Sequence, residues 1–199
     1  LIWQAADARV RGFLMGATAG RTTLLGEGLQ HQDGHSLVLA STVPAVQAYD
    51  PAFAFELGAI VKDGINRMYG PDTPESERDV IYYITLYNEN YPLPALPDHP
   101  ETSAEFERGA VRGLYRWKPA PQGKTHSATI VFSGISHQAA TIAANELADH
   151  YDVGAELWSA TSYKRLREQA LEVERSNRLH PSTPQEEPLV TQLLNDSLG

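Results

Sequence analysis

Cysteine is absent from this sequence of 199 residues, which excludes disulfide bonds, thiolate catalysis and cysteine-ligated zinc. The sequence also has no apolar run long enough to cross a bilayer and no secretory leader at its start. Positive charge is scarce, because 16 Lys and Arg face 25 Asp and Glu, for a net charge of −9 without a basic cluster. These absences disfavour membrane and nucleic-acid partners. They predict a cytoplasmic protein that binds a small molecule or another protein.

The composition that remains is that of a globular protein, with 42% apolar and 21% charged residues. The opening residues have apolar side chains at helical spacing, which predicts one helix that continues through Phe13 and Leu14 and ends near Gly16. A second helix is expected to be capped by Asp50, to start at Pro51 and to stop at Gly70. Its apolar face is Phe53, Leu57, Ile60, Val61, Ile65 and Met68.

Residues 80–87 are β-branched and aromatic without polar alternation, which predicts a central strand covered on both faces. Prolines make 91–100 irregular, and 104–117 follows as a short helix that leads into a strand. The second half then alternates in type: strand 128–133, helix 137–150, strand 155–160, helix 163–174 and a helix start at 188–196. Such alternation implies parallel strands and an α/β fold.

The Pro- and Gly-rich stretch 119–125 is the best linker candidate in the chain. We therefore expect one domain over 1–118 and the start of another over 126–199. The last helix has no partner strand after it, so further polypeptide is expected beyond this sequence.

The densest group of functional side chains lies in the glycine-rich stretch 26–35, which holds Glu27, His31, Asp33 and His35. A carboxylate beside a histidine can raise the proton affinity of the imidazole and fix its tautomer, as proton transfer near neutral pH requires. The same pattern also arises in capped turns, where Asp and His satisfy backbone groups. A weaker alternative is a metal-dependent hydrolase that uses His31, Asp33 and His35 as ligands.

Other patterns in the sequence are weaker indications of a functional site. The stretch 16–21 lacks the Gly-Lys-Ser/Thr ending of a phosphate loop and is expected to be a turn. The stretch 87–91 (Tyr-Asn-Glu-Asn-Tyr) follows a strand, where α/β sheets place ligands, but a plain turn at the sheet edge is the favoured interpretation. The remaining histidines are expected at the surface or at helix caps: His99, His126, His137, His150 and His180. The aromatics Tyr82, Tyr83 and Trp158 are expected in the core.

Four stretches carry a family resemblance: GRTTLLGEGLQHQDGHS at 20–36, AYDPAFAFE at 48–56, RMYG at 67–70 and YITLYNENY at 83–91. With Gly134, WSATS at 158–162 and LHP at 179–181, they resemble the homodimeric bacterial pyruvate dehydrogenase decarboxylase family over essentially the whole chain. The resemblance implies a transketolase-like α/β fold, with 1–118 in the pyrimidine-side cofactor domain and 126–199 at the start of the C-terminal domain.

The resemblance further implies thiamine diphosphate and Mg²⁺ as cofactors and pyruvate as substrate. The implied partners are a second protomer and the lipoyl domain and core of dihydrolipoamide acetyltransferase. Glu27 and His31 match the active-centre glutamate and histidine of the family, and Asp33 and His35 fall in the same motif as substrate-binding candidates.

The family's Gly-Asp-Gly…Asn motif for magnesium and diphosphate is missing from this sequence, as is the glutamate that activates the aminopyrimidine. The isolated chain is therefore expected to bind the cofactor feebly and to be inactive alone. The alternative is a non-catalytic module for dimerisation or docking, which the presence of both Glu27 and His31 disfavours.

Overall fold

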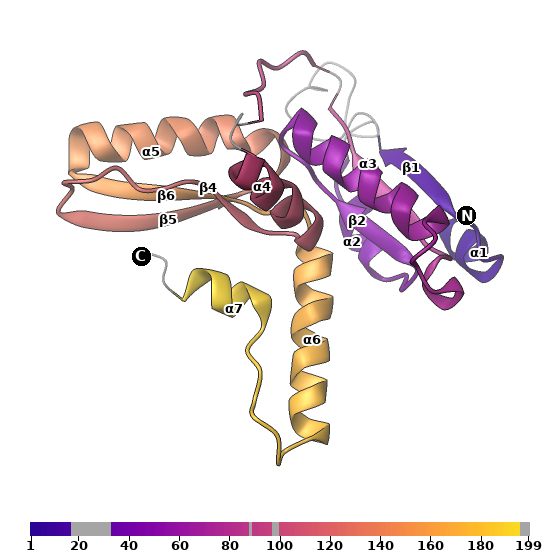
Figure 1. Ribbon diagram of the computed structural model, residues 1–199. Helices are drawn as coiled ribbons and strands as arrows, with labels where there is room; N and C mark the ends of the chain where they lie inside the picture. Colours follow the sequence, from indigo (N-terminus) through magenta and orange to yellow (C-terminus); the bar gives the residue numbers. More distant parts are fainter. Residues whose placement is uncertain (17–32, 88, 97–99, 196–199) are drawn as a thin grey trace.

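The computed structural model describes residues 1–16, 33–87, 89–96 and 100–195, and the side chains of 100 and 101 are not described. The chain forms two three-stranded sheets, each with helices on its faces (Figure 1). No helix in the described residues is both long and apolar enough to span a bilayer.

The first sheet is parallel and has the strand order β1-β3-β2. Its strands are β1 (Gly12–Gly16), β2 (Val46–Tyr49) and β3 (Ile81–Thr85). All five residues of β3 are buried, because this strand pairs on both edges and is covered on both faces. The predicted central strand is confirmed.

Helices cover both faces of this sheet. On one face, α3 (Ala54–Tyr69) packs its apolar stripe against stacked Tyr49 and Tyr82, whose ring centroids are 5.9 Å apart. On the other face, α1 (Ile2–Asp7) and α2 (Ser36–Ser41) pack against buried Ala48 and Tyr83. Tyr82 and Tyr83 therefore anchor opposite faces of the sheet, as their assignment to the core predicts.

Two expectations about helix boundaries are wrong. The opening helix ends at Asp7, because Arg9 adopts a left-handed conformation (φ 55°) and the apolar residues after it form β1 beside β3. Asp50 does not cap α3, which begins at Ala54. The backbone N–H groups of Ala52 and Phe53 donate instead to the carboxylate of Glu56.

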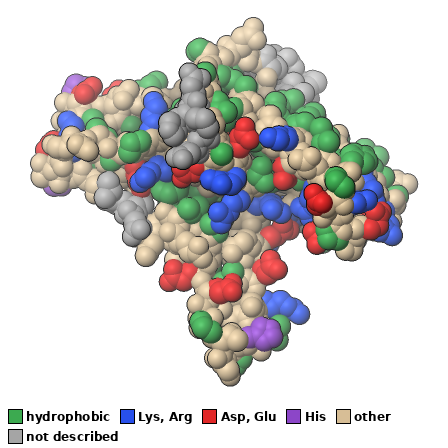
Figure 2. All heavy atoms as spheres, in the orientation of Figure 1, with side chains coloured by type: hydrophobic (Ala, Val, Ile, Leu, Met, Phe, Trp, Pro, Cys, Tyr) green, Lys and Arg blue, Asp and Glu red, His purple; other side chains and the backbone are tan. Residues whose placement is uncertain are grey.

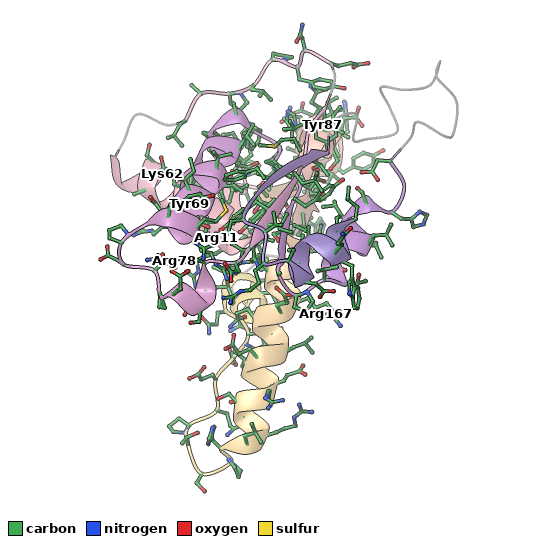
Figure 3. All side chains as sticks on the ribbon, turned by 90° about the vertical axis from the view of Figure 1, so that its right-hand side faces the viewer. Arg11, Lys62, Tyr69, Arg78, Tyr87 and Arg167 are labelled. Atoms are coloured by element: carbon green, nitrogen blue, oxygen red, sulfur yellow. The ribbon has the colours of Figure 1, made fainter. Side chains whose placement is uncertain are left out.

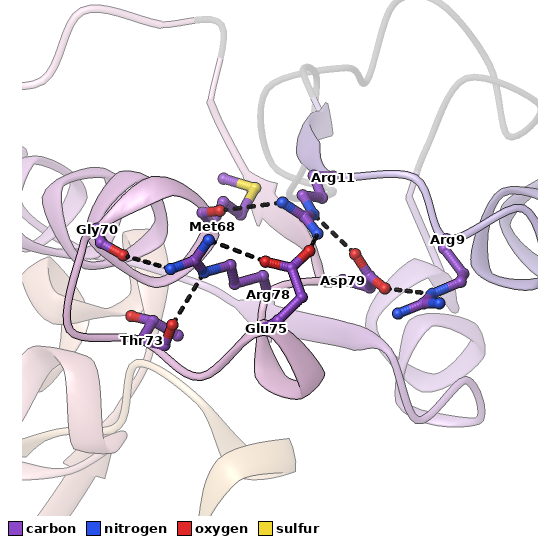
Figure 4. Close-up of polar contacts among 8 residues, drawn as sticks. All are labelled: Arg9, Arg11, Met68, Gly70, Thr73, Glu75, Arg78 and Asp79. Carbon is purple, nitrogen blue, oxygen red and sulfur yellow. Dashed lines mark hydrogen bonds and ion pairs between the residues drawn. The ribbon is translucent and has the colours of Figure 1, made fainter.

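Arginine side chains connect the amino-terminal segment to the loop before β3 through hydrogen bonds and ion pairs (Figure 4). Arg9 and Arg11 both donate to Asp79, and Arg11 also reaches Glu75 at 2.6 Å. Arg78 donates to Glu75 at 2.9 Å, while its other nitrogens bind carbonyls of the same loop. These contacts lie at the end of the first sheet opposite Tyr87 (Figure 3).

The second sheet has the order β4-β6-β5 and contains β4 (Tyr115–Lys118), β5 (His126–Phe132) and β6 (Val153–Ser159). The strands β5 and β6 are parallel and are joined through α5 (His137–Tyr151), as the strand-helix-strand pattern predicts. The strand β4 runs antiparallel to β6. The sheet therefore gains its third strand from residues before the proposed linker at 119–125, and the domain limits at 118 and 126 stay a prediction.

The helix α4 (Pro100–Arg112) leads into β4, as expected for this stretch. The helix α6 (Tyr163–Leu179) extends away from both sheets, and α7 (Leu189–Leu194) returns beside it (Figure 1). Buried Trp158 packs with Leu166 and Leu189, so one apolar cluster joins β6, α6 and α7. Two short 3-10 turns complete the described elements, at Glu75–Glu77 and Gly134–Ser136.

Candidate active site

Polar side chains gather where β2 and β3 end, at the carboxyl edge of the first sheet. Asp50 follows β2, and its Oδ1 accepts hydrogen bonds from the hydroxyls of Thr85 (2.5 Å) and Tyr87 (2.6 Å). Burial and the neighbouring Asp50 carboxylate raise the pKa of Tyr87, so its hydroxyl stays protonated and acts as a donor. This edge is where parallel α/β sheets place ligands.

The backbone of Asp50 ties this edge to the second half of the chain. Its N–H donates to the carbonyl of Thr161 at 2.7 Å, and its carbonyl accepts the N–H of Gly134 at 3.2 Å. Gly134 has φ +50°, and a Cβ on it would lie 1.8 Å from the hydroxyl of Tyr87. Only glycine leaves room for this close approach. The edge therefore depends on residues more than 80 positions apart in the sequence.

Asp33 and His35, two of the four predicted site residues, lie beside this edge. They line an open hollow of about 290 Å³ together with Asp50, Thr85 and Tyr87. The carboxylate of Asp33 accepts the backbone N–H of Ser36 at 3.1 Å and also the Ser36 hydroxyl, which stabilises the start of α2. Asp33 thus satisfies a backbone group at a helix start, as the capped-turn interpretation predicts, and it also lines the hollow.

Glu27 and His31, the predicted catalytic pair, lie outside the described residues, as does His99. The described neighbours on either side of their segment both lie at the carboxyl edge. Gly16 ends β1 and accepts the N–H of Leu86 at 2.9 Å, and Asp33 lines the hollow. Gly16 and Asp33, which flank the segment 17–32 in the sequence, therefore both lie at this edge.

A second hollow of about 300 Å³ shares Thr85 and Tyr87 with the first and has mainly apolar walls from Phe53, Leu57 and Leu93. Glu89, Asn90 and Tyr91 line it too, so the stretch 87–91 does face a cavity. His137 contributes from the start of α5 with 8% exposure, and its ring contacts Phe53 edge-on with centroids 5.1 Å apart. Burial lowers the pKa of His137, which favours the neutral imidazole.

Of the two locations expected for His137, the surface or a helix cap, burial excludes the surface, and the residue lies at the start of α5. Sequence reasoning missed Asp50, Thr85 and His137 as site residues. The rule that ligands bind at strand ends could have found Thr85, which lies near the end of the predicted strand 80–87. It could not have found Asp50, because no strand was predicted before that residue. No local pattern marks His137, since long-range packing brings it to Phe53.

Behind the edge, Glu56 of α3 is fully buried and joins the two sheets. Its Oε1 accepts the hydroxyls of Tyr115 (2.7 Å) and Ser159 (2.6 Å), and its Oε2 accepts the N–H groups that precede α3. Burial raises the pKa of Glu56 and the four donors oppose that rise. The carboxylate therefore links α3 to β4 and β6 and has a structural role.

Solved structures place this architecture in a known class. A transketolase from Pichia stipitis matches 88% of this chain with 22% of its own, at a TM-score of 0.60 and 18% identity. A transketolase from Leishmania mexicana matches 86% of the chain with 22% of its own, at a TM-score of 0.58 and 14% identity. At such identities the likeness shows the fold alone, and that fold is transketolase-like, as predicted.

Sequence comparison supports the recognised resemblance. Residues 1–94 match the pyruvate dehydrogenase E1 component middle domain. Over 100% of its length the chain is 48% identical to the pyruvate dehydrogenase E1 component of Mycolicibacterium smegmatis, and over 99% it is 41% identical to that of Escherichia coli K12. Over its whole length the chain is therefore similar to pyruvate dehydrogenase E1 components, and it spans 20–21% of the length of these relatives. The recognised resemblance is confirmed.

Proposed function

We propose that this chain is part of an enzyme that oxidatively decarboxylates pyruvate and transfers the acetyl group to the lipoyl group of dihydrolipoamide acetyltransferase. The enzyme acts as a cytoplasmic homodimer with thiamine diphosphate and Mg²⁺. One observation carries the proposal: residues 1–94 match the E1 middle domain, and this range holds Glu27, His31, Asp33 and His35. It also holds the carboxylate and hydroxyls of the sheet edge.

The described residues do not by themselves fit magnesium and a diphosphate. Among them, no three His, Asp or Glu side chains are grouped so that they could hold a metal ion. The carboxylate of Asp50 already accepts two hydroxyls, so it is held as a structural acceptor. We assign the diphosphate and metal ligands of the cofactor to polypeptide that is not part of this sequence, because the Gly-Asp-Gly…Asn motif is missing from it.

Within the proposal, His31 hydrogen-bonds pyruvate and transfers a proton during acetyl transfer, and Glu27 orients the groups around it. Asp33 fixes the first turn of α2, so it holds His35 at the rim of the hollow where substrate would enter. Tyr87 and Thr85 donate to Asp50 and keep the floor of that hollow in place. These roles require the segment 17–32 to place His31 beside the described edge.

The proposal is tested by His31→Ala in the complete enzyme, with acetylation of the lipoyl domain as the readout. Loss of a proton-transfer group lowers turnover by about 10²–10⁴-fold. The matched control is His150→Ala, which removes an exposed imidazole on α5. A loss confined to His31→Ala supports the assignment. Unchanged lipoyl acetylation in that variant refutes it.

A further inference from the structure

A third cavity shares no residue with the hollows at the sheet edge. It lies among α4, β4 and α7, has a volume of about 610 Å³, and is the largest of the cavities described here. Volumes of this size are typical of sites for small molecules. Three arginines line it: Arg108 and Arg112 from α4 and Arg116 from β4.

The charge at this cavity opposes that of the chain as a whole, which is −9. Arg108 and Arg112 are four residues apart and so project from the same side of α4, where two like charges repel. Neither forms a hydrogen bond or an ion pair within the part of the chain that the structure describes. Arg116 lies 3.7 Å from buried Glu156, measured between Nη1 and Oε2.

Glu105 is the one acidic residue that lines the cavity among the described residues, and Arg116 has Glu156 nearby, so two of the three guanidinium groups have no ion-pair partner among those residues. Figure 2 shows Lys and Arg side chains gathered across the middle of the visible face, where α4 lies in Figure 1. Guanidinium groups form forked hydrogen bonds with phosphate and carboxylate groups. The surplus of positive charge therefore favours an anionic ligand with several acceptor oxygens.

The wall of the cavity supplies a second observation. Trp158 lines it with 5% exposure, and its indole N–H is buried without a hydrogen-bond partner in the described residues. A buried donor without an acceptor is unfavourable, and such groups are rare in native proteins. Leu114 and Leu193 add apolar walls. The cavity thus combines arginine side chains with an apolar part of its wall, which Trp158, Leu114 and Leu193 form.

Gly109 allows α4 to pack closely against β4. A Cβ at this position would lie 2.3 Å from the Cβ of Tyr115, so only glycine lets α4 approach β4 this closely. The close approach brings Arg108 and Arg112 of the helix to the same cavity as Arg116 of the strand.

We propose that this cavity is a binding site for a small polyanion that bears phosphate or carboxylate groups. The arginines bind the charged groups, and the apolar part of the wall contacts the body of the ligand. The site is separate from the proposed active site, so its occupation does not require pyruvate or cofactor.

The test is a calorimetric titration of the full chain with inorganic pyrophosphate and, separately, with citrate, at low ionic strength and at about 0.15 M salt. We expect binding that weakens with salt. Preference for pyrophosphate identifies a phosphate ligand, and preference for citrate identifies a carboxylate ligand. Failure of both probes to bind overturns the proposal.

The decisive variant is Arg108→Gln/Arg112→Gln, which should weaken binding about tenfold or more. The control is Arg175→Gln/Arg178→Gln, which removes the same charge from the exposed part of α6 and should leave the affinity unchanged. Equal weakening in both pairs indicates nonspecific attraction and contradicts the site. Glu105→Gln is an independent test that stays valid if the arginine variant misfolds. Removal of this acid from the cavity wall should tighten binding about threefold. Unchanged or weaker binding in Glu105→Gln argues against the proposal.

Discussion

Replacement of Gly134 by alanine should disrupt the joint between the sheet edge and the second half of the chain. The new Cβ would lie 1.8 Å from the Tyr87 hydroxyl and 2.7 Å from Oδ1 of Asp50. Tyr87 must then move, and the hydrogen bond that it donates to the carboxylate at 2.6 Å is lost. The backbone at φ +50° is also unfavourable for any residue with a side chain.

The magnitude follows from these two effects. The left-handed backbone costs alanine about 1 kcal/mol, and loss of a hydrogen bond to a charged group costs about 2–3 kcal/mol. The free energy of unfolding should therefore fall by about 3–4 kcal/mol. For a chain of this length, that corresponds to a decrease in Tm of about 6–16 °C.

The assay is thermal unfolding followed by circular dichroism, with Gly123→Ala as the matched control. Gly123 also has a positive φ (80°), but no heavy atom lies within 4 Å of its Cβ position. It should therefore lose only the backbone contribution of about 1 kcal/mol. Addition of Tyr87→Phe to Gly134→Ala removes the closest clashing atom and should restore part of the loss. Equal Tm values for the two alanine variants would refute the reasoning.

Two further predictions concern carboxylates. Glu56→Ala should lower the free energy of unfolding by about 3 kcal/mol or more, because it leaves the Tyr115 and Ser159 hydroxyls buried without their acceptor, whereas Glu56→Gln keeps an acceptor and should lose less. Burial raises the pKa of Glu56 in the folded state, so the contribution of Glu56 to the free energy of unfolding is highest below its unfolded pKa of about 4.3. This contribution declines as the pH rises through the folded-state pKa. Denaturant titrations at several pH values should show that Glu56→Gln removes the decline. Asp79→Asn should lower Tm near neutral pH and much less in acid, because hydrogen bonds from Arg11 and Arg9 lower the pKa of Asp79 and its stabilisation is lost as pH falls through that lowered value. A Tm for Asp79→Asn that equals the parent value at neutral pH and low salt would contradict this.

Local sequence patterns predicted much of the fold. The β-branched and aromatic run at 80–87 identified the central strand, and the alternation after 126 identified the parallel pair β5 and β6. Competition between helical spacing and strand pairing caused the main error, because Phe13 and Leu14 fit a helical stripe and yet pair with β3. The placement of β4 beside β6 depends on long-range packing that no local pattern encodes.

The site was predictable to a smaller extent. The composition of 26–35 led to Asp33 and His35, which the structure places together at a hollow. The carboxylate of Asp50 was mistaken for a helix cap, because an Asp-Pro pair before an apolar stripe is typical of a helix start. Its actual partners, Thr85 and Tyr87, are more than 30 residues away and reach it only through the parallel pairing of β2 and β3.

The central claim is that Glu27 and His31 face the hollow lined by Asp33, His35 and Tyr87. It is tested most directly by a crystal structure of the complete enzyme with its cofactor and a pyruvate analogue bound. We predict that the His31 imidazole lies within hydrogen-bond distance of the analogue at this edge. A structure in which both side chains are packed in a closed core away from the analogue would contradict the account.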